Sequence, residues 1–344
     1  MDTVGRKRAS RERHHGVVAN VSARIRSWLA WLQCHNKAIC VATAVVAVVG
    51  TALSLSGCSV VQPTGGLRVV STTTQVSDFT RTVVGDAGTV YGLIRANQTA
   101  HEFDPSARAL WELSQANVVV MNGQGLEQWM SAALEAAGFH GTLIVASEGI
   151  ETVDGDPHVW TSTINAQRMV GTIATGLSRV DAAHADVFSA NAANYQARLQ
   201  ALTTWATDDF AQIPEAERLL VTNHDGLSYF CREFSITFIG SIIPSFDDNS
   251  EPSAADIDRL IDAIRRSGAV AVFSETTISA KLAETLAREA HVAVYSGADA
   301  LYADTLGPTG SAGATYIEAT IHNVRVLVTA WGGTNTSLPE GVLA

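Results

Sequence analysis

The stretch Asp181–Ile213, with the sequence DAAHADVFSANAANYQARLQALTTWATDDFAQI, predicts one long helix that joins two halves of the chain. Asp181 is a favourable N-cap residue, and Pro214 follows the end of the stretch. Apolar residues recur at spacings of three and four, as in a helix with one buried face: Phe188, Ala192, Tyr195, Leu199, Leu202, Ala206 and Phe210. Such a helix would extend roughly 45 Å, enough to run along two lobes. A surface helix of a single domain is the alternative.

Short β-rich runs alternate with helical stretches on both sides of this helix. Before it, we expect strands at Leu67–Ser71, Thr89–Leu93, Val118–Met121 and Thr142–Ala146, with helices at Ser77–Val84, Pro105–Ser114 and Leu126–Ala137. After it, we expect strands at Leu219–Thr222, Thr237–Ser241, Val270–Ser274 and Val292–Tyr295, with helices at Gly226–Phe234, Ser253–Ser267, Ser279–Ala290 and Ala314–Trp331. This alternation predicts an α/β fold of two lobes, with largely parallel sheets, joined by one long interlobe helix.

The N-terminal region predicts export. A basic segment leads into the uncharged apolar run Ala38–Leu53, which is typical of an export signal or a membrane anchor. The run ends in Leu55-Ser56-Gly57-Cys58, which resembles the bacterial lipobox, where cleavage precedes a cysteine that carries lipid. We therefore expect Cys58 to be lipidated and the protein to lie on the outer face of the cytoplasmic membrane, with an uncleaved helix as the alternative.

The domain boundaries follow from these segments. A chain of 344 residues favours two domains over one. We expect a signal peptide at 1–57, a lipidated tether at 58–66, an N-terminal α/β lobe at 67–180, the linking helix at 181–213 and a C-terminal α/β lobe at 214–344. Removal of the signal would leave Cys231 as the one cysteine without lipid, so no internal disulfide is expected.

The exported body is acidic. The whole chain has a net charge of −11, but its first 57 residues hold 8 basic and 2 acidic side chains, which leaves 15 against 32, or −17, for the rest. This balance argues against a nucleic-acid partner and is compatible with a cationic ligand.

Four side chains at the ends of predicted strands, or in the loops after them, are candidate metal ligands: His101, His158, His224 and Asp304. Ligands of parallel sheets bind beyond the carboxyl ends of the strands. Three imidazoles and one carboxylate make a four-coordinate set for a divalent transition metal. Two residues from each half would place this metal in the cleft between the lobes.

The local motifs around these residues resemble those of the metal-binding components of bacterial ABC importers for zinc and manganese. They are His101-Glu102-Phe103-Asp104-Pro105, Asp156-Pro157-His158-Val159-Trp160, Thr222-Asn223-His224-Asp225-Gly226 with Tyr229-Phe230, Glu251-Pro252-Ser253, and Asp304-Thr305-Leu306. The resemblance runs from about Leu67 to the C-terminus. It implies two α/β lobes bridged by a rigid helix, a largely buried metal held by His101, His158, His224 and Asp304, and delivery to an ABC permease and its ATPase. A long His-rich loop, found in one branch of the family, is lacking here.

The composition of the ligand set favours zinc, with manganese as the alternative. Three neutral imidazoles and one carboxylate suit tetrahedral Zn²⁺, whereas Mn²⁺ prefers more oxygen ligands. The resemblance adds that a glutamate at the position of His224 is similar to what manganese-binding members use. The leading hypothesis is therefore a metal-binding protein that is not an enzyme. Two other functions compete with it: an exported zinc hydrolase and a surface adhesin.

The other candidate residues have simpler interpretations. His14, His15 and His35 precede the lipobox, and His140, His184, His291 and His322 have no matching motif. Glu275 ends a predicted strand near the cleft, where it would either orient a ligand imidazole or lie in solvent. Asp247 and Asp248 are interpreted as loop charges, and Cys231 as a small buried apolar residue.

Overall fold

The computed structural model describes residues 66–247 and 250–343. The predicted signal peptide and the tether up to Gly65, with Cys58, lie outside these residues, and so does Asp248. Within the described part, none of the helices has the length and apolar character needed to cross a membrane.

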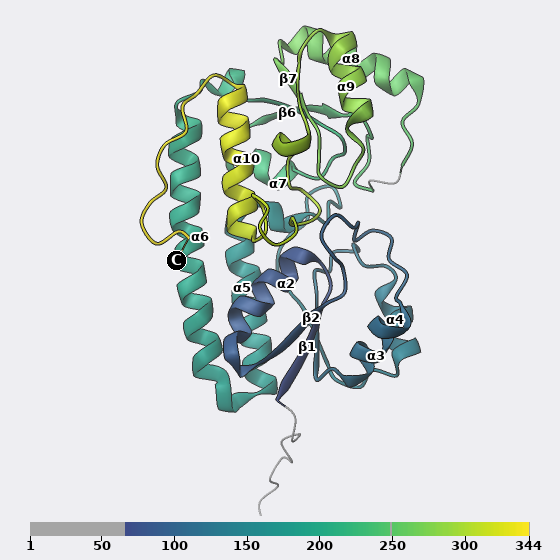
Figure 1. The fold of residues 1–344 in the computed structure, drawn as a ribbon, viewed down its shortest axis with the longest axis vertical. Coiled ribbons are helices and arrows are strands. Elements are labelled where there is room, and N and C mark those ends of the chain that lie inside the picture. Colours follow the sequence, from purple (N-terminus) through teal and green to yellow (C-terminus); the bar gives the residue numbers. More distant parts are fainter. Residues whose placement is uncertain (1–65, 248–249, 344) are drawn as a thin grey trace, which may run out of the picture. The chain divides into compact units, whose positions relative to one another are not determined.

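The first half of the body is a four-stranded parallel sheet with helices on both faces (Figure 1). The strand order is β2-β1-β3-β4, with bounds Leu67–Ser71 for β1, Gly88–Gly92 for β2, Val118–Met121 for β3 and Thr142–Val145 for β4. Helices α3 (Ala107–Gln115) and α4 (Met130–Ala137) cover one face, and α2 (Thr74–Val84) and α5 (Thr163–Val180) cover the other. Because all four strands are parallel, their carboxyl ends share one edge of the sheet.

The second half repeats this arrangement with shorter strands. Two parallel ladders form it, β5 with β6 and β7 with β8, and β5 lies beside β7. The strands are Leu219–Thr222, Thr237–Ser241, Ala271–Phe273 and Ala293–Tyr295, and the helices are α7 (Ser228–Glu233), α8 (Ala254–Ser267), α9 (Ala280–Ala290) and α10 (Tyr316–Ala330). The predicted α/β fold of two lobes with parallel sheets is confirmed.

The long helix is α6, Ala185–Ala211, which runs alongside both halves in Figure 1. Every apolar residue of its predicted stripe is buried. Full burial of side chains such as Leu199 and Leu202 contributes roughly 1.5–3 kcal/mol each. The helix begins later than predicted, because a 3-10 turn spans Ala182–His184 and Asp181 ends α5 instead of capping α6. The Asp181 carboxylate contacts Nδ1 of His184 at 2.7 Å.

Helix α5 has no counterpart among the predicted elements. It packs along α6, to which the 3-10 turn Ala182–His184 joins it, and covers one face of the first sheet (Figure 1). Its sequence is rich in threonine and β-branched residues and includes Gly171 and Gly176, which are poor helix formers. Gly176 is needed for packing, since a Cβ atom there would lie 2.5 Å from the Ile144 side chain of β4.

A second difference concerns α4, which begins at Met130 rather than Leu126. The buried Glu127 carboxylate accepts hydrogen bonds from the backbone N–H groups of Asn122 and Gly123, at 2.7 and 3.0 Å, and from the hydroxyl of Thr72 at 2.6 Å. These bonds hold residues 122–127 in a loop, so the helix starts only after it.

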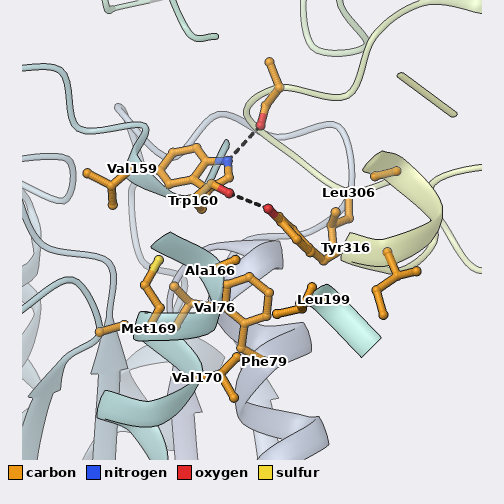
Figure 2. Close-up of a cluster of buried hydrophobic side chains, with 14 of the residues drawn as sticks. Val76, Phe79, Val159, Trp160, Ala166, Met169, Val170, Leu199, Leu306 and Tyr316 are labelled. Carbon is orange, nitrogen blue, oxygen red and sulfur yellow. Dashed lines mark hydrogen bonds between the residues drawn. The ribbon is translucent and has the colours of Figure 1, made fainter. Parts of the chain in front are cut away.

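The hydrophobic core is continuous between the two halves (Figure 2). Trp160 is its centre: its indole N–H donates to the carbonyl of Ala303, and its own carbonyl accepts from the hydroxyl of Tyr316 at 2.7 Å. Around it pack residues of α2, α5, α6 and α10, among them Val76, Phe79, Met169, Val170 and Leu199. Trp160 is two residues from His158 and Ala303 is next to Asp304. This core therefore fixes two candidate ligands from different halves relative to each other.

Candidate metal centre

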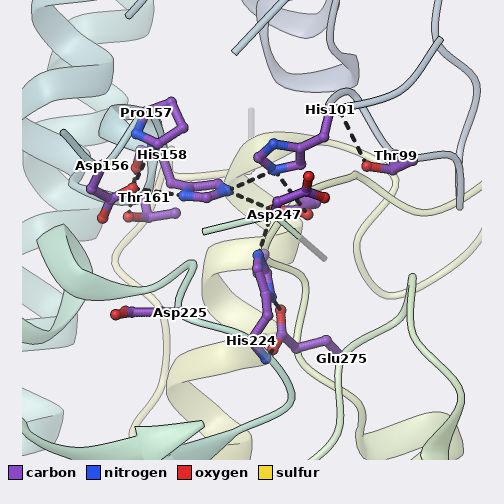
Figure 3. A network of polar contacts seen from close by, with 12 residues as sticks. Thr99, His101, Asp156, Pro157, His158, Thr161, His224, Asp225, Asp247 and Glu275 are labelled. Atoms are coloured by element: carbon purple, nitrogen blue, oxygen red, sulfur yellow. Dashed lines mark hydrogen bonds and ion pairs between the residues drawn. The ribbon is translucent and has the colours of Figure 1, made fainter. Parts of the chain in front are cut away.

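The four candidate ligands meet at the carboxyl ends of the strands (Figure 3). His101 lies in the loop between β2 and α3, and His158 precedes the 3-10 turn Val159–Thr161. His224 lies two residues after β5, and Asp304 follows β8. One donor atom from each residue lies within 4.8 Å of all the others. The structure thus brings together two candidate residues from each half of the body.

The three imidazoles direct Nε2 toward Asp304. The Nε2 atoms of His158 and His224 lie 3.2 and 3.3 Å from Oδ1 of Asp304. The Nε2 of His101 lies 3.8 Å from Oδ2 of Asp304 and 3.1 Å from Nε2 of His158. The side chain of His101 is 10% exposed, whereas the other three are at most 1% exposed. Access to the cluster is therefore on the His101 side.

His158 is oriented by Asp156. The Asp156 carboxylate accepts hydrogen bonds from Nδ1 of His158, at 2.6 Å, and from its backbone N–H, at 2.9 Å. Tyr229 of the second half supports this loop, because its hydroxyl donates to the carbonyl of Asp156 at 2.8 Å and accepts from the N–H of Val153 at 3.0 Å. Sequence reasoning assigned no role to Asp156. Its position two residues before a candidate ligand was the available signal.

His224 is oriented by Glu275. Oε2 of Glu275 lies 2.7 Å from Nδ1 of His224, and Oε1 accepts from the backbone N–H of His224 at 2.9 Å. The backbone N–H of Glu275 in turn donates to Oδ1 of Asn223 at 2.9 Å. Glu275 is only 2% exposed, so of its two predicted interpretations the solvent-exposed one is wrong. A partner on Nδ1 holds the imidazole so that Nε2 points into the cluster.

Gly226 leaves room for the His224 ring. A Cβ atom at this position would lie 2.5 and 2.6 Å from two ring atoms of His224 and 3.5 Å from Oδ1 of Asp304. Any side chain would therefore displace this ligand. The motif Thr222-Asn223-His224-Asp225-Gly226 thus combines a donor with the space that the donor needs.

The charges in the cluster are strongly coupled. Burial lowers the pKa of His101 in spite of the Asp304 carboxylate. Burial opposes protonation of His158 as well, but the Asp304 and Asp156 carboxylates outweigh it and raise the pKa of His158 to about 9. Asp304 and Glu275 likewise outweigh burial and raise the pKa of His224 well above its usual range. Burial would raise the pKa of Asp304, yet His224 and His158 hold it well below its usual range.

Several buried polar atoms lack hydrogen-bond partners in the described part of the chain. They include both carboxylate oxygens of Asp304 and Nε2 of His224. Buried polar atoms without partners are rare in folded proteins, and an ion or a water molecule is a common partner where several of them converge. Three nitrogen donors and an oxygen donor, converging in a buried space, suit a divalent transition metal.

The other described histidines lie outside this cluster. His184 contacts Asp181, Nε2 of His322 lies 3.0 Å from the carbonyl of Ala300, and His291 ends α9 with a positive φ of 62°. Cys231 is buried, as predicted, and burial raises the pKa of its thiol. Asp247 is exposed, and its charge acts on His101.

The sequence of the chain matches the model of a known protein family. A family model described as ZnuA, zinc-uptake complex component A, periplasmic, matches residues 69–330, well over half of the chain. The match includes all four clustered residues. It also includes Asp156 and Glu275.

Relatives of this chain are named for different metals. The chain is 28% identical over 268 residues to the manganese-binding lipoprotein MntA of Halalkalibacterium halodurans, covering 76% of this chain and 88% of the relative. It is 28% identical over 304 residues to the zinc-binding lipoprotein AdcA of Streptococcus pneumoniae serotype 4, covering 80% of this chain and 58% of the relative. A solved structure of TroA, described for its metal binding specificity, has a TM-score of 0.71 and 27% identity, covering 78% of this chain and 100% of its own.

Proposed function

Because the chain belongs to the family of zinc-uptake complex component A, we propose that it captures Zn²⁺ in the His101, His158, His224 and Asp304 cluster and delivers it to an ABC permease. In general terms, it is a metal-binding substrate-binding protein of an ABC importer. Its family and relatives bind solutes for transport and are not enzymes, so the zinc hydrolase hypothesis is rejected.

The set of donor atoms is the observation that supports zinc as the bound metal. Zn²⁺ is bound by histidine nitrogen at about 2.0–2.1 Å and by carboxylate oxygen at about 2.0–2.2 Å, usually in four-coordinate tetrahedral sites. The described cluster offers three such nitrogens and one such carboxylate, all largely buried. Asp304 would also supply a negative charge, which offsets part of the cost of burying a divalent cation.

Manganese is the second candidate, because the relative from Halalkalibacterium halodurans is named for manganese binding. Mn²⁺ favours more oxygen ligands than this cluster offers, and sites with nitrogen ligands generally bind Zn²⁺ more tightly than Mn²⁺. The nitrogen-rich cluster therefore supports zinc over manganese.

Release would require the two halves of the cluster to separate. His101 and His158 belong to the first half of the body, whereas His224 and Asp304 belong to the second. Any relative movement of the two halves would split the donor set into pairs, and two donors hold a metal less tightly than four. The domain boundaries predicted from the sequence, 67–180, 181–213 and 214–344, stay a prediction.

Delivery to a permease also needs a location at the membrane. Relatives are named as lipoproteins, which supports an anchor on the outer face of the cytoplasmic membrane. In this chain we propose Cys58 as the lipidated residue, preceded by a signal peptide at 1–57 and followed by the tether at 58–66.

Competition titrations against a chelating indicator test the metal assignment. We expect the unmodified protein to bind Zn²⁺ more tightly than Mn²⁺. His224→Glu replaces a nitrogen donor by an oxygen donor, so it should narrow this preference. A protein that binds Mn²⁺ more tightly than Zn²⁺, or a variant with the unmodified ratio of affinities, would show that the assignment from ligand chemistry is wrong.

A further inference from the structure

An exposed tryptophan with two arginines against its ring lies at the end of the first sheet remote from the metal cluster. Trp111 of α3 is 47% exposed. The guanidinium carbons of Arg108 and Arg68 lie 4.6 and 5.4 Å from the centroid of its ring, within cation–π range. Both arginines also pair with Glu112, Arg68 at 3.0 Å. We call Arg68, Arg108 and Trp111 the Trp111 cluster.

This cluster is fixed to the start of the described chain. Arg68 is the second residue of β1. Its backbone N–H donates to Oδ1 of Asn117 at 2.9 Å, and its carbonyl accepts from the backbone N–H of Asn117 at 2.9 Å. Leu67 is nine positions after Cys58. Nine residues span at most about 30 Å when fully extended. A lipid on Cys58 would therefore keep the Trp111 cluster within that reach of the bilayer.

The chemistry of the cluster matches a bilayer surface. Tryptophan is enriched at the membrane–water interface, where its apolar ring and its N–H meet both environments. Arginines next to it attract anionic headgroups. The two arginines and Glu112 sum to a charge of +1, on a body whose charge from residue 58 onward is −17. An acidic body is repelled by an anionic bilayer, so a basic and aromatic face near the tether determines which side approaches it.

We propose that the Trp111 cluster contacts the headgroup region of an anionic bilayer and orients the tethered protein. The proposal rests on the proposed location at the membrane, but not on the identity of the metal. Strand β1 leads from the cluster toward the metal centre; its five residues place its two ends about 13 Å apart. The contact thus leaves the metal centre away from the bilayer while the protein captures free metal, and the protein must leave this orientation to deliver the metal to the permease.

Quenching of tryptophan fluorescence by brominated lipid tests this contact. The full chain, as isolated from its membrane, is reconstituted into phosphatidylcholine vesicles that contain phosphatidylglycerol, with and without bromine on the acyl chains. Trp160, Trp205 and Trp331 are at most 8% exposed and serve as internal references. We expect quenching in the unmodified protein and its loss in Trp111→Phe. Trp129→Phe is the matched control, because Trp129 lies in the same half with its N–H bound to the carbonyl of Ala100.

The arginines are tested separately, so that the result does not depend on one variant. Arg108→Gln should reduce quenching, whereas Arg288→Gln, an exposed arginine of α9, should not. Quenching should also weaken as salt rises, since the screening length falls from about 10 Å at 0.1 M to about 3 Å at 1 M. Equal quenching in the unmodified protein and in Trp111→Phe, or no quenching in either, would overturn the proposal.

Two parallel measurements separate this proposal from the proposed function. The melting shift on zinc addition should be the same in Trp111→Phe and the unmodified protein, because the cluster is remote from the metal centre. If zinc does not shift the melting temperature but quenching still depends on Trp111, the zinc assignment is refuted and the membrane contact is not. A protein without lipid should float with the vesicles only through the cluster, and Trp111→Phe should then abolish flotation. Flotation unchanged by this substitution in a protein without lipid would overturn the contact.

Discussion

Replacing Glu275 by glutamine tests whether the orientation of His224 sets the metal affinity. Glu275→Gln keeps the shape of the side chain and an oxygen that can accept from the backbone N–H of His224, a bond of 2.9 Å in the structure. It removes the negative charge that lies 2.7 Å from Nδ1 of His224. The substitution therefore removes a single charged contact and leaves the four candidate ligands in place.

The expected loss follows from the burial of this contact. Glu275 is 2% exposed, so solvent does not replace the lost charge. Bonds to charged groups contribute roughly 1.5–3 kcal/mol, and loss of the partner of a metal-bound histidine typically lowers metal affinity about 10–100-fold. We therefore expect Zn²⁺ affinity to fall about 10–100-fold, equivalent to about 1.4–2.7 kcal/mol. The Glu275 carboxylate also raises the pKa of His224 in the metal-free protein, so the loss should grow as pH rises and protons compete less.

Competition with a chelating indicator, at several pH values and constant ionic strength, measures this loss. Glu284→Gln is the matched control, because Glu284 is an exposed carboxylate of α9 in the same half of the body. An affinity of Glu275→Gln within twofold of the unmodified protein at every pH would refute the orienting role. An equal loss in Glu284→Gln would show that general charge, rather than this contact, is responsible.

Three further predictions concern stability, pH and the anchor. Zn²⁺ at a thousandfold excess over Kd should stabilise the protein by roughly 4 kcal/mol, measured in thermal melts. His158→Ala should remove most of this stabilisation, and His140→Ala should remove none of it. A melting temperature that stays the same after verified removal of the metal and after its return would count against the site. Because their raised pKa values keep His158 and His224 protonated at neutral pH, both protons must leave when the metal binds, so affinity should rise by more than tenfold per pH unit between pH 7 and 9. Over the same range the metal-free protein should lose stability, since protonated His158 stabilises the folded state fully below its unfolded-state pKa of 6.5 and no longer above its folded-state pKa of about 9. Calorimetry of metal binding in buffers of different ionisation enthalpy would count the protons released. A count near zero at pH 7 would contradict the predicted loss of protons on metal binding. Cys58→Ser should abolish fatty-acid labelling, because only the thiol forms the thioether, and label retained in the variant would exclude the lipobox interpretation.

Local patterns in the sequence predicted most of the elements. Strand–helix alternation was enough for the α/β fold, and the periodicity of Phe188 to Phe210 was enough for the buried face of α6. Helix α5 was missed because its threonines, β-branched residues and two glycines have low intrinsic helix propensity. Its stability comes from packing against α6, which a single-sequence pattern does not reveal. The start of α4 was missed for a similar reason, since Glu127 bonds to the loop before it.

The types and strand-end positions of the four clustered residues were determined by the sequence alone. Their convergence was decided by the tertiary structure, because His101 and Asp304 are about 200 positions apart and meet only when the core around Trp160 joins the two halves. The orienting contacts depend on the same packing: Glu275 reaches His224 because β7 lies beside β5, and Tyr229 supports the Asp156 loop from the other half. The sequence determines which donors are available, since this depends on side-chain chemistry and local motifs. Distances of 3–4 Å between them depend on how the separate elements pack, and no local pattern encodes that packing.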